Sequence, residues 1–303
     1  MSMSYRPGWL KIIYTVLIWP LEAVFAVVLF GLLAALPVGL ASFCLGRLFV
    51  WLGPMTPWHK RAAEQMALAL PHSKQTEKQV WLRQMWDNLG RTSAEFMKTR
   101  QMLDKGYIQF EGLHHLDGHE GGFVIGAHLG NWEALSMLGP AKGVRTGLIY
   151  RPLNNPYVSV LLKRRALSAK ADIYEKGRQA AIGMVSTLRK GGFMLILADQ
   201  KLREGETVAF FGYPAQTAIA HVKLAAKTGK PIFMAQTIRT SGCQIKVVLS
   251  SPLYVPKEAD DAAIRAFASR LNQLFESWIT QYPGQWLWPH RRWGKTPPTR
   301  LSE

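Results

Sequence analysis

The hydrophobic positions of the chain begin with one long run near the N-terminus. Residues 12–51 are overwhelmingly apolar, and residues 23–46 carry no charged side chain. Because a helix needs about 20 apolar residues to cross a bilayer, this run predicts one uncleaved membrane-spanning helix, kinked at Pro37. A helical hairpin or an in-plane segment that bends at Pro37 is the alternative. We therefore divide the chain into a membrane anchor, residues 1–52, and a second domain, residues 53–303.

Two amphipathic patterns of helical period follow the apolar run. Residues 58–70 predict a basic helix that ends near Pro71, and residues 76–103 predict a second, longer helix. The large apolar and aromatic residues of the longer helix fall near one face. They would pack this helix against its neighbours, or form part of a groove for an acyl chain.

From about Gly121 onward, short apolar runs alternate with amphipathic stretches. The short runs predict strands over residues 122–127, 147–150, 193–198, 231–239 and 244–249. The longer stretches predict helices over residues 132–138, 156–170, 179–189, 219–227 and 260–281. This alternation favours an α/β domain built around a central sheet.

Composition and charge restrict the partners of the domain. The 303 residues carry a formal charge of +17, and 48% are hydrophobic. Such a charge implies an anionic partner: an acidic membrane, a phosphorylated substrate, an acidic protein or nucleic acid. Eleven tryptophans favour a membrane interface, and no zinc spacing or RNA-binding signature supports nucleic acid. Cys44 and Cys243 are too few for a disulfide framework or a cysteine-based metal site.

The stretch from Gly121 to Glu133 carries the strongest chemical signal. His128 directly follows a predicted buried strand, and Glu133 lies in the first turn of the next predicted helix. Across such a turn the two side chains can fold back into a hydrogen-bonded pair. The imidazole would then take a proton from a hydroxyl, while the carboxylate fixes its tautomer. The alternative is a capped, buried histidine beside a surface glutamate.

Other polar residues also follow predicted strands or form basic clusters. Arg151 and Asp199 each come directly after a strand, where sites of open α/β sheets gather. An arginine there can present its planar fork to a phosphate, or form a surface salt bridge. Asp199 could instead cap a helix or pair with a neighbouring cation. Basic clusters at residues 163–165 and 291–292 would contact anionic partners, or be solvated faces.

The sequence GAHLGNWE, residues 126–133, resembles the His-x4-Asp/Glu motif of the late lipid A acyltransferases. These are the lauroyl- and myristoyltransferases that add secondary acyl chains to Kdo-lipid IVA. Further matches follow in order at residues 86–91, 150–152, 198–200, 210–212 with Thr217, and 285–293. The resemblance covers nearly the whole chain, and the ordered set is more specific than one histidine and one carboxylate.

The resemblance implies a glycerophosphate-acyltransferase-like α/β fold: a central mixed sheet flanked by helices, with an N-terminal transmembrane helix. It implies a single-pass protein of the bacterial inner membrane whose catalytic domain, residues 53–303, lies on the cytoplasmic face. The enzyme would move a fatty acyl chain from acyl carrier protein to a hydroxyl of an anionic lipid A precursor. We expect no metal, no cofactor beyond the acyl-carrier donor, and no nucleic acid.

The same resemblance, combined with residue chemistry, assigns the expected site. His128 would be the general base and Glu133 the group that orients it. The expected substrate-binding residues are Asn131, Arg151, Lys163, Arg164, Asp199, Arg291 and Arg292. Two other functions remain open: an acyltransferase acting on a glycerophospholipid or another glycolipid, and a non-enzymatic basic membrane adaptor that binds anionic lipid or nucleic acid.

Overall fold

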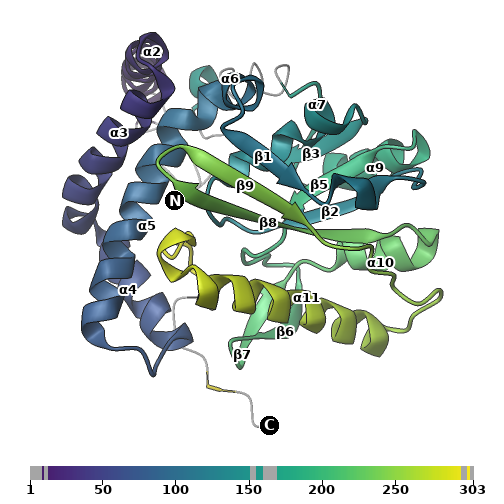
Figure 1. The fold of residues 1–303 in the computed structure, drawn as a ribbon. Helices are drawn as coiled ribbons and strands as arrows, with labels where there is room; N and C mark the ends of the chain where they lie inside the picture. The colour runs from purple at the N-terminus through teal and green to yellow at the C-terminus, as the bar shows by residue number, and fades with distance from the viewer. Residues whose placement is uncertain (1–8, 10–12, 151–154, 160–168, 295–298, 301–303) are drawn as a thin grey trace.

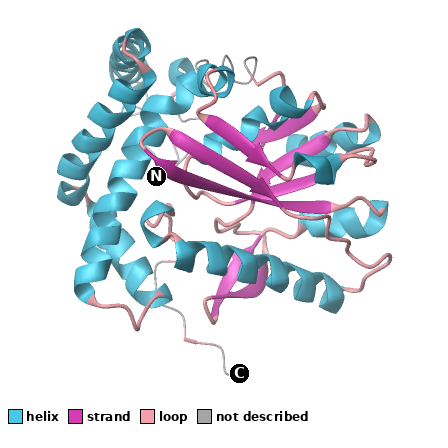
Figure 2. Cartoon of the chain, in the orientation of Figure 1, coloured by secondary structure: helices cyan, strands magenta, loops and turns pink. Residues whose placement is uncertain are grey.

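The computed structural model describes residues 9, 13–150, 155–159, 169–294 and 299–300. A central sheet has helices on both faces, and the N-terminal helices stand together along one end of it (Figures 1 and 2). This arrangement confirms the predicted mixed α/β fold with a central sheet flanked by helices.

The N-terminal apolar run forms two helices rather than one. A short π-helical turn, η2 (Tyr14–Ile18), leads into α2 (Trp19–Ala35), and α3 (Val38–Leu52) follows. Leu36 between them is extended, with φ −82° and ψ 151°. Proline drives the preceding residue out of the helical region, so Pro37 breaks the helix at the position where the sequence predicted only a kink. By length and composition alone, Tyr14–Ala35 and Val38–Met55 could each cross a membrane.

Helix α3 lies against the long helix α5 (Gln75–Glu95). Their backbones meet where both helices carry glycine: a Cβ on Gly90 would lie 2.4 Å from the carbonyl oxygen of Leu45. Helix α4 (Pro57–Ala69) matches its prediction. The helix predicted over residues 76–103 is divided at Phe96 into α5, a 3-10 turn η4 (Phe96–Lys98) and α6 (Thr99–Asp104).

Seven strands form the main sheet in the order β1-β9-β8-β2-β5-β3-β4. Neighbouring strands are parallel, except that β8 and β9 pair as an antiparallel hairpin. The strands span β1 (Ile108–Glu111), β2 (Gly122–Gly126), β3 (Thr146–Tyr150), β4 (Asp172–Glu175), β5 (Phe193–Leu197), β8 (Ile232–Ser241) and β9 (Gln244–Leu249). A separate hairpin joins β6 (Glu206–Phe210) to β7 (Tyr213–Thr217). The sequence prediction found five of these strands and missed β1, β4, β6 and β7.

Two apolar layers cover the sheet, because alternate residues of a strand point to opposite faces. On β2, Phe123 and Ile125 belong to one core cluster and Val124 to the other. The first cluster includes side chains of α4, α5, α9 (Arg178–Arg189), α10 (Ala220–Thr228) and α11 (Asp261–Gln281). The second includes side chains of α6, η5 (Leu113–Leu116), η6 (Trp132–Met137) and α7 (Leu138–Lys142). Strand β2 is therefore central, and the residue after its end emerges between the two layers.

Candidate active site

His128 and Asp199 lie just beyond the carboxyl ends of two adjacent strands. Strands β2 and β5 run parallel with Gly126 opposite Leu197, and the amide of Ala198 donates to the carbonyl of Gly126. Each strand thus ends two residues before a candidate site residue. The prediction that one edge of the sheet gathers these side chains is confirmed for this pair.

The carboxylate of Asp199 holds His128 by two hydrogen bonds. One oxygen lies 2.8 Å from Nδ1 of the imidazole, and the other accepts from the backbone amide of His128 at 3.0 Å. The second oxygen also accepts from the indole Nε1–H of Trp286 at 2.7 Å. With Nδ1 bound to the carboxylate, Nε2 is the ring nitrogen that remains for a substrate, and the His128 side chain is 18% exposed.

Asp199 is suited to remain ionised although it is buried. Burial alone would raise the pKa of Asp199, but the electrostatic interaction with His128 and the hydrogen bonds from His128 and Trp286 outweigh it. The net pKa of Asp199 therefore lies below its usual value. A buried carboxylate of this kind fixes the tautomer of the ring and stabilises the imidazolium when it forms.

The structure corrects the predicted partner of His128. Glu133 lies in the first turn of η6, where its carboxylate accepts a hydrogen bond from the indole of Trp132 at 3.0 Å. The Trp132 ring lies 5.3 Å from the His128 ring, centroid to centroid. The prediction that Glu133 orients the imidazole is therefore wrong for Nδ1, whose partner is Asp199. The reason is that Asp199, which follows the adjacent strand β5, occupies Nδ1.

Asn131 supports the loop after His128 and is fully buried. Its side-chain oxygen accepts from the amide of Glu133, which caps η6, and its Nδ2 donates to Glu95 at 2.6 Å. Both ends of the amide are thus engaged inside the protein. Asn131, predicted to bind substrate, instead positions the loop.

Glu95 links that loop to two other parts of the fold. Its carboxylate forms a bidentate ion pair with Arg239 at 2.7 and 2.8 Å and accepts from Ser42 on α3 at 2.7 Å. Arg239 also donates to Asn88 at 2.8 Å, and Asn88 donates to the carbonyl of Gly130 at 2.8 Å. A buried network therefore joins α3, α5, β8 and the loop that carries His128.

The sequence analysis did not identify Glu95 or Arg239 as site residues. A signal exists in α5, where Asn88, Thr92 and Glu95 recur at helical spacing. All three are buried in a helix that otherwise buries mainly apolar residues. A polar stripe on the buried face of a helix indicates partners across the interface, because buried polar groups are hydrogen-bonded.

The C-terminal segment completes the support of His128. The amide of Leu287 donates to the carbonyl of His128 at 3.1 Å, and Leu129 pairs with Trp286 in an isolated β-bridge. Nearby, His290 Nε2 accepts from the amide of Lys201. Burial lowers the pKa of His290 to about 4, so this imidazole is neutral with its proton on Nδ1.

The basic residues predicted to bind substrate differ in their burial, and some lie outside the described residues. Arg292 is fully buried, where its guanidinium donates to the carbonyl of Gln216 and to Thr217 and lies over the ring of Phe210. A side chain without exposed surface cannot contact a substrate, so Arg292 instead holds the C-terminal segment onto β7. Arg291 beside it is partly exposed. Three further predicted residues lie outside the described part of the chain: Arg151, Lys163 and Arg164.

Comparison with known proteins adds independent information. The model of the family described as bacterial lipid A biosynthesis acyltransferase matches residues 14–295. The chain is 26% identical over 271 residues to a lipid A biosynthesis acyltransferase of Haemophilus influenzae, covering 84% of each chain. It is 27% identical over 293 residues to the lipid A biosynthesis palmitoleoyltransferase of Escherichia coli, covering 85% of this chain and 92% of the relative.

Among solved structures, the 1-acyl-sn-glycerophosphate acyltransferase of Thermotoga maritima is similar over 79% of this chain and 94% of its own. Its TM-score of 0.39 and sequence identity of 10% are too low to bear on function. The assignment therefore depends on the family match, which spans nearly the whole chain and includes every described residue of the His128 site. On that basis, this chain belongs to the bacterial lipid A biosynthesis acyltransferase family.

Proposed function

We propose that this protein transfers a fatty acyl chain from acyl carrier protein to a hydroxyl group of a lipid A precursor, as a secondary acylation. Membership of the family establishes acyl transfer in lipid A biosynthesis. The observation that carries the proposal is the His128–Asp199 pair at the edge of the sheet. It gives a partly exposed imidazole whose Nδ1 is bound to a carboxylate, which leaves Nε2 as the nitrogen available to take a proton.

In the first step, Nε2 of His128 removes the proton from the acceptor hydroxyl as the oxygen attacks the thioester carbonyl. The ring becomes an imidazolium, and the negative charge of Asp199 stabilises it at 2.8 Å. The carbonyl carbon becomes tetrahedral, with the former carbonyl oxygen carrying the negative charge. The new ester C–O bond forms in this step.

In the second step, the tetrahedral intermediate collapses and the C–S bond breaks. The departing thiolate of the acyl carrier takes the proton from Nε2, which returns His128 to the neutral form. The products are the ester on the lipid and the free thiol of the carrier. Direct transfer of this kind requires no covalent enzyme intermediate, and the sequence contains no Gly-x-Ser-x-Gly nucleophile motif.

The proposed location follows from the two substrates. Acyl carrier protein is a soluble acidic protein, and the acceptor is a lipid, so the site must meet both at a membrane surface. The charge of +17 suits both anionic partners, and the apolar helices α2 and α3 suit an anchor in the bacterial inner membrane. We place the catalytic domain on the cytoplasmic face, where the carrier is available.

His128→Ala tests the catalytic role. In membranes supplied with acyl-carrier thioester and lipid A precursor, the variant should lose about 10²–10⁴-fold in the rate of acyl transfer. The matched control is His114→Ala, because His114 is an exposed histidine on η5. Full activity of His128→Ala, with the His114 control also active, contradicts the general-base role.

The products identify donor and acceptor. Mass spectrometry of lipid A from cells with and without the gene should show one secondary acyl chain missing when the gene is absent. In vitro, acyl-carrier thioester should support transfer and the matching coenzyme A thioester should do so poorly. An unchanged lipid A profile, or transfer to glycerophospholipid instead, contradicts the proposed acceptor.

A further inference from the structure

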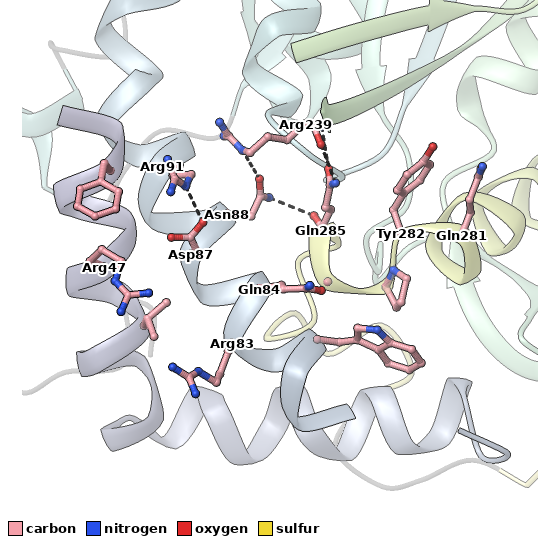
Figure 3. Close-up of a pocket in the computed structure, with 15 residues that line it drawn as sticks. Arg47, Arg83, Gln84, Asp87, Asn88, Arg91, Arg239, Gln281, Tyr282 and Gln285 are labelled. Atoms are coloured by element: carbon pink, nitrogen blue, oxygen red, sulfur yellow. Dashed lines mark hydrogen bonds and ion pairs between the residues drawn. The ribbon is translucent and has the colours of Figure 1, made fainter. Parts of the chain in front are cut away.

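A cavity lies on the far side of the buried network that supports the His128 loop, and His128 itself does not line it. The cavity has a volume of about 600 Å³ and lies between α3, α5 and the corner where α11 meets the 3-10 turn η7 (Pro283–Gln285). Figure 3 shows its polar side chains. We refer to it as the α3–α5 pocket. Its lining includes Phe43 and the four arginines Arg47, Arg83, Arg91 and Arg239.

Two of the four arginines in the pocket are already neutralised. Arg91 pairs with Asp87 at 2.5 Å, and the guanidinium of Arg239 is held by the buried carboxylate of Glu95. These two therefore build the wall of the pocket and offer little attraction to a further anion.

The other two arginines supply excess positive charge. The side chains of Arg47, from α3, and Arg83, from α5, are exposed and lie toward the same end of the pocket (Figure 3). Within the described residues, neither guanidinium has a hydrogen-bond or ion-pair partner. Arginine forks bind phosphate oxygens by paired N–H donors, so two unpaired forks beside one cavity form a phosphate-binding arrangement.

The apolar side of the pocket indicates what kind of molecule would carry a phosphate bound there. Phe43 lines the pocket and also belongs to the exposed apolar face of α3, which includes Leu48 and Trp51. Helix α3 is long and apolar enough to meet a membrane. The pocket is thus continuous with a surface suited to lipid chains, while its arginines suit a charged head group. An anion dissolved in water would gain nothing from the apolar face.

We propose that the α3–α5 pocket binds the phosphate-bearing head group of an anionic lipid, with Arg47 and Arg83 as the phosphate ligands and the outer face of α3 beside the acyl chains. The head group would come either from a phospholipid such as phosphatidylglycerol or from a phosphorylated lipid A disaccharide. The proposal concerns binding, and it holds whatever chemistry His128 performs.

Native mass spectrometry of the full chain in detergent measures this binding. The protein is titrated separately with phosphatidylglycerol, with bisphosphorylated lipid A disaccharide, with phosphatidylcholine of the same chains, and with inorganic phosphate. The Arg47→Gln/Arg83→Gln double variant should bind the anionic lipids at least tenfold more weakly. The matched control is Arg265→Gln/Arg270→Gln, which removes the same charge from exposed positions on α11.

The titrations with phosphatidylglycerol and with the lipid A disaccharide distinguish the two candidate head groups. Retention of the disaccharide but not of phosphatidylglycerol supports a lipid A head group, and equal retention of both supports a general anionic head-group site. Unchanged affinity in the Arg47/Arg83 variant overturns the proposal, as does an equal loss in the α11 control. Tight binding of phosphatidylcholine, or of inorganic phosphate without lipid, also overturns it. Equal melting temperatures of the two double variants show that any loss is not due to unfolding.

Discussion

Replacing Glu95 with glutamine should destabilise the protein far more than an ordinary carboxylate-to-amide change. Glu95 is fully buried, and its two oxygens accept from Ser42, Asn131 and both terminal nitrogens of Arg239. The amide of glutamine keeps one acceptor oxygen and turns the other end into a donor. That donor would face groups that are donors themselves.

The magnitude follows from the burial of the pair. The side chain of Arg239 is 8% exposed, so removing the charge of Glu95 leaves a largely buried guanidinium without a counter-ion. Breaking one partner of a buried ion pair costs about 3–5 kcal/mol. For a domain of this size, each kcal/mol lowers the melting temperature by about 2–4 °C, which gives a decrease of roughly 6–20 °C.

Thermal and urea unfolding in detergent, followed by tryptophan fluorescence, measure the effect. The control is Asp104→Asn, which makes the same chemical change in the exposed Arg100–Asp104 pair and should cost less than about 1 kcal/mol. A double variant, Glu95→Gln with Arg239→Met, should recover part of the loss because no charge is left unpaired. If Glu95→Gln lowers the free energy of unfolding no more than Asp104→Asn does, the buried Glu95–Arg239 ion pair does not stabilise the fold.

Three further changes test other parts of the structure. Asp199→Asn should slow acyl transfer by about 10²–10⁴-fold, because the ring of His128 loses its charged partner. The pKa of Asp199 is lowered in the folded protein, so its carboxylate stabilises the fold above pH about 3.9, and this stabilisation is lost as the pH falls through the folded pKa. The Asn variant should therefore lack this part of the stability loss in acid-unfolding curves. Burial lowers the pKa of His221 to about 4, so stability should fall as pH drops from about 6.5 to 4, and His221→Phe should make that fall shallower in melting curves. Arg292→Met should lower the free energy of unfolding by roughly 2–4 kcal/mol through lost buried hydrogen bonds, while Arg291→Ala should change it by less than about 0.5 kcal/mol in urea titrations.

The strands that the sequence predicted are those whose apolar pattern is strongest. Every residue of β2 is buried, because helices cover both faces of the sheet there. The missed strands β1 and β4 lie at the two edges, have four residues each and leave part of their side chains exposed. Their hydrophobic pattern is too short to distinguish from a loop. Their pairing depends on a neighbouring strand that sequence periodicity does not identify.

The site was predictable where it follows from sheet geometry and unpredictable where it depends on distant contacts. His128 and Asp199 each follow a parallel strand, so the rule for open α/β sheets brings them together. The prediction that Glu133 orients the His128 imidazole is wrong for Nδ1, because it was based on spacing along the chain. The path of the loop is instead set by Trp286 and Asn88, which are far from it in sequence. Such contacts leave no local periodicity to detect.

The bridge between Leu129 and Trp286 has a consequence for how the enzyme is made. A ribosome synthesises the two apolar N-terminal helices first and the segment around Trp286 almost last. Until that segment has left the exit tunnel, Asp199 lacks its indole donor and the carbonyl of His128 lacks the amide of Leu287. A nascent chain can therefore complete its N-terminal helices before the His128–Asp199 pair has all its supports, and a chain that terminates before residue 286 would lack them altogether.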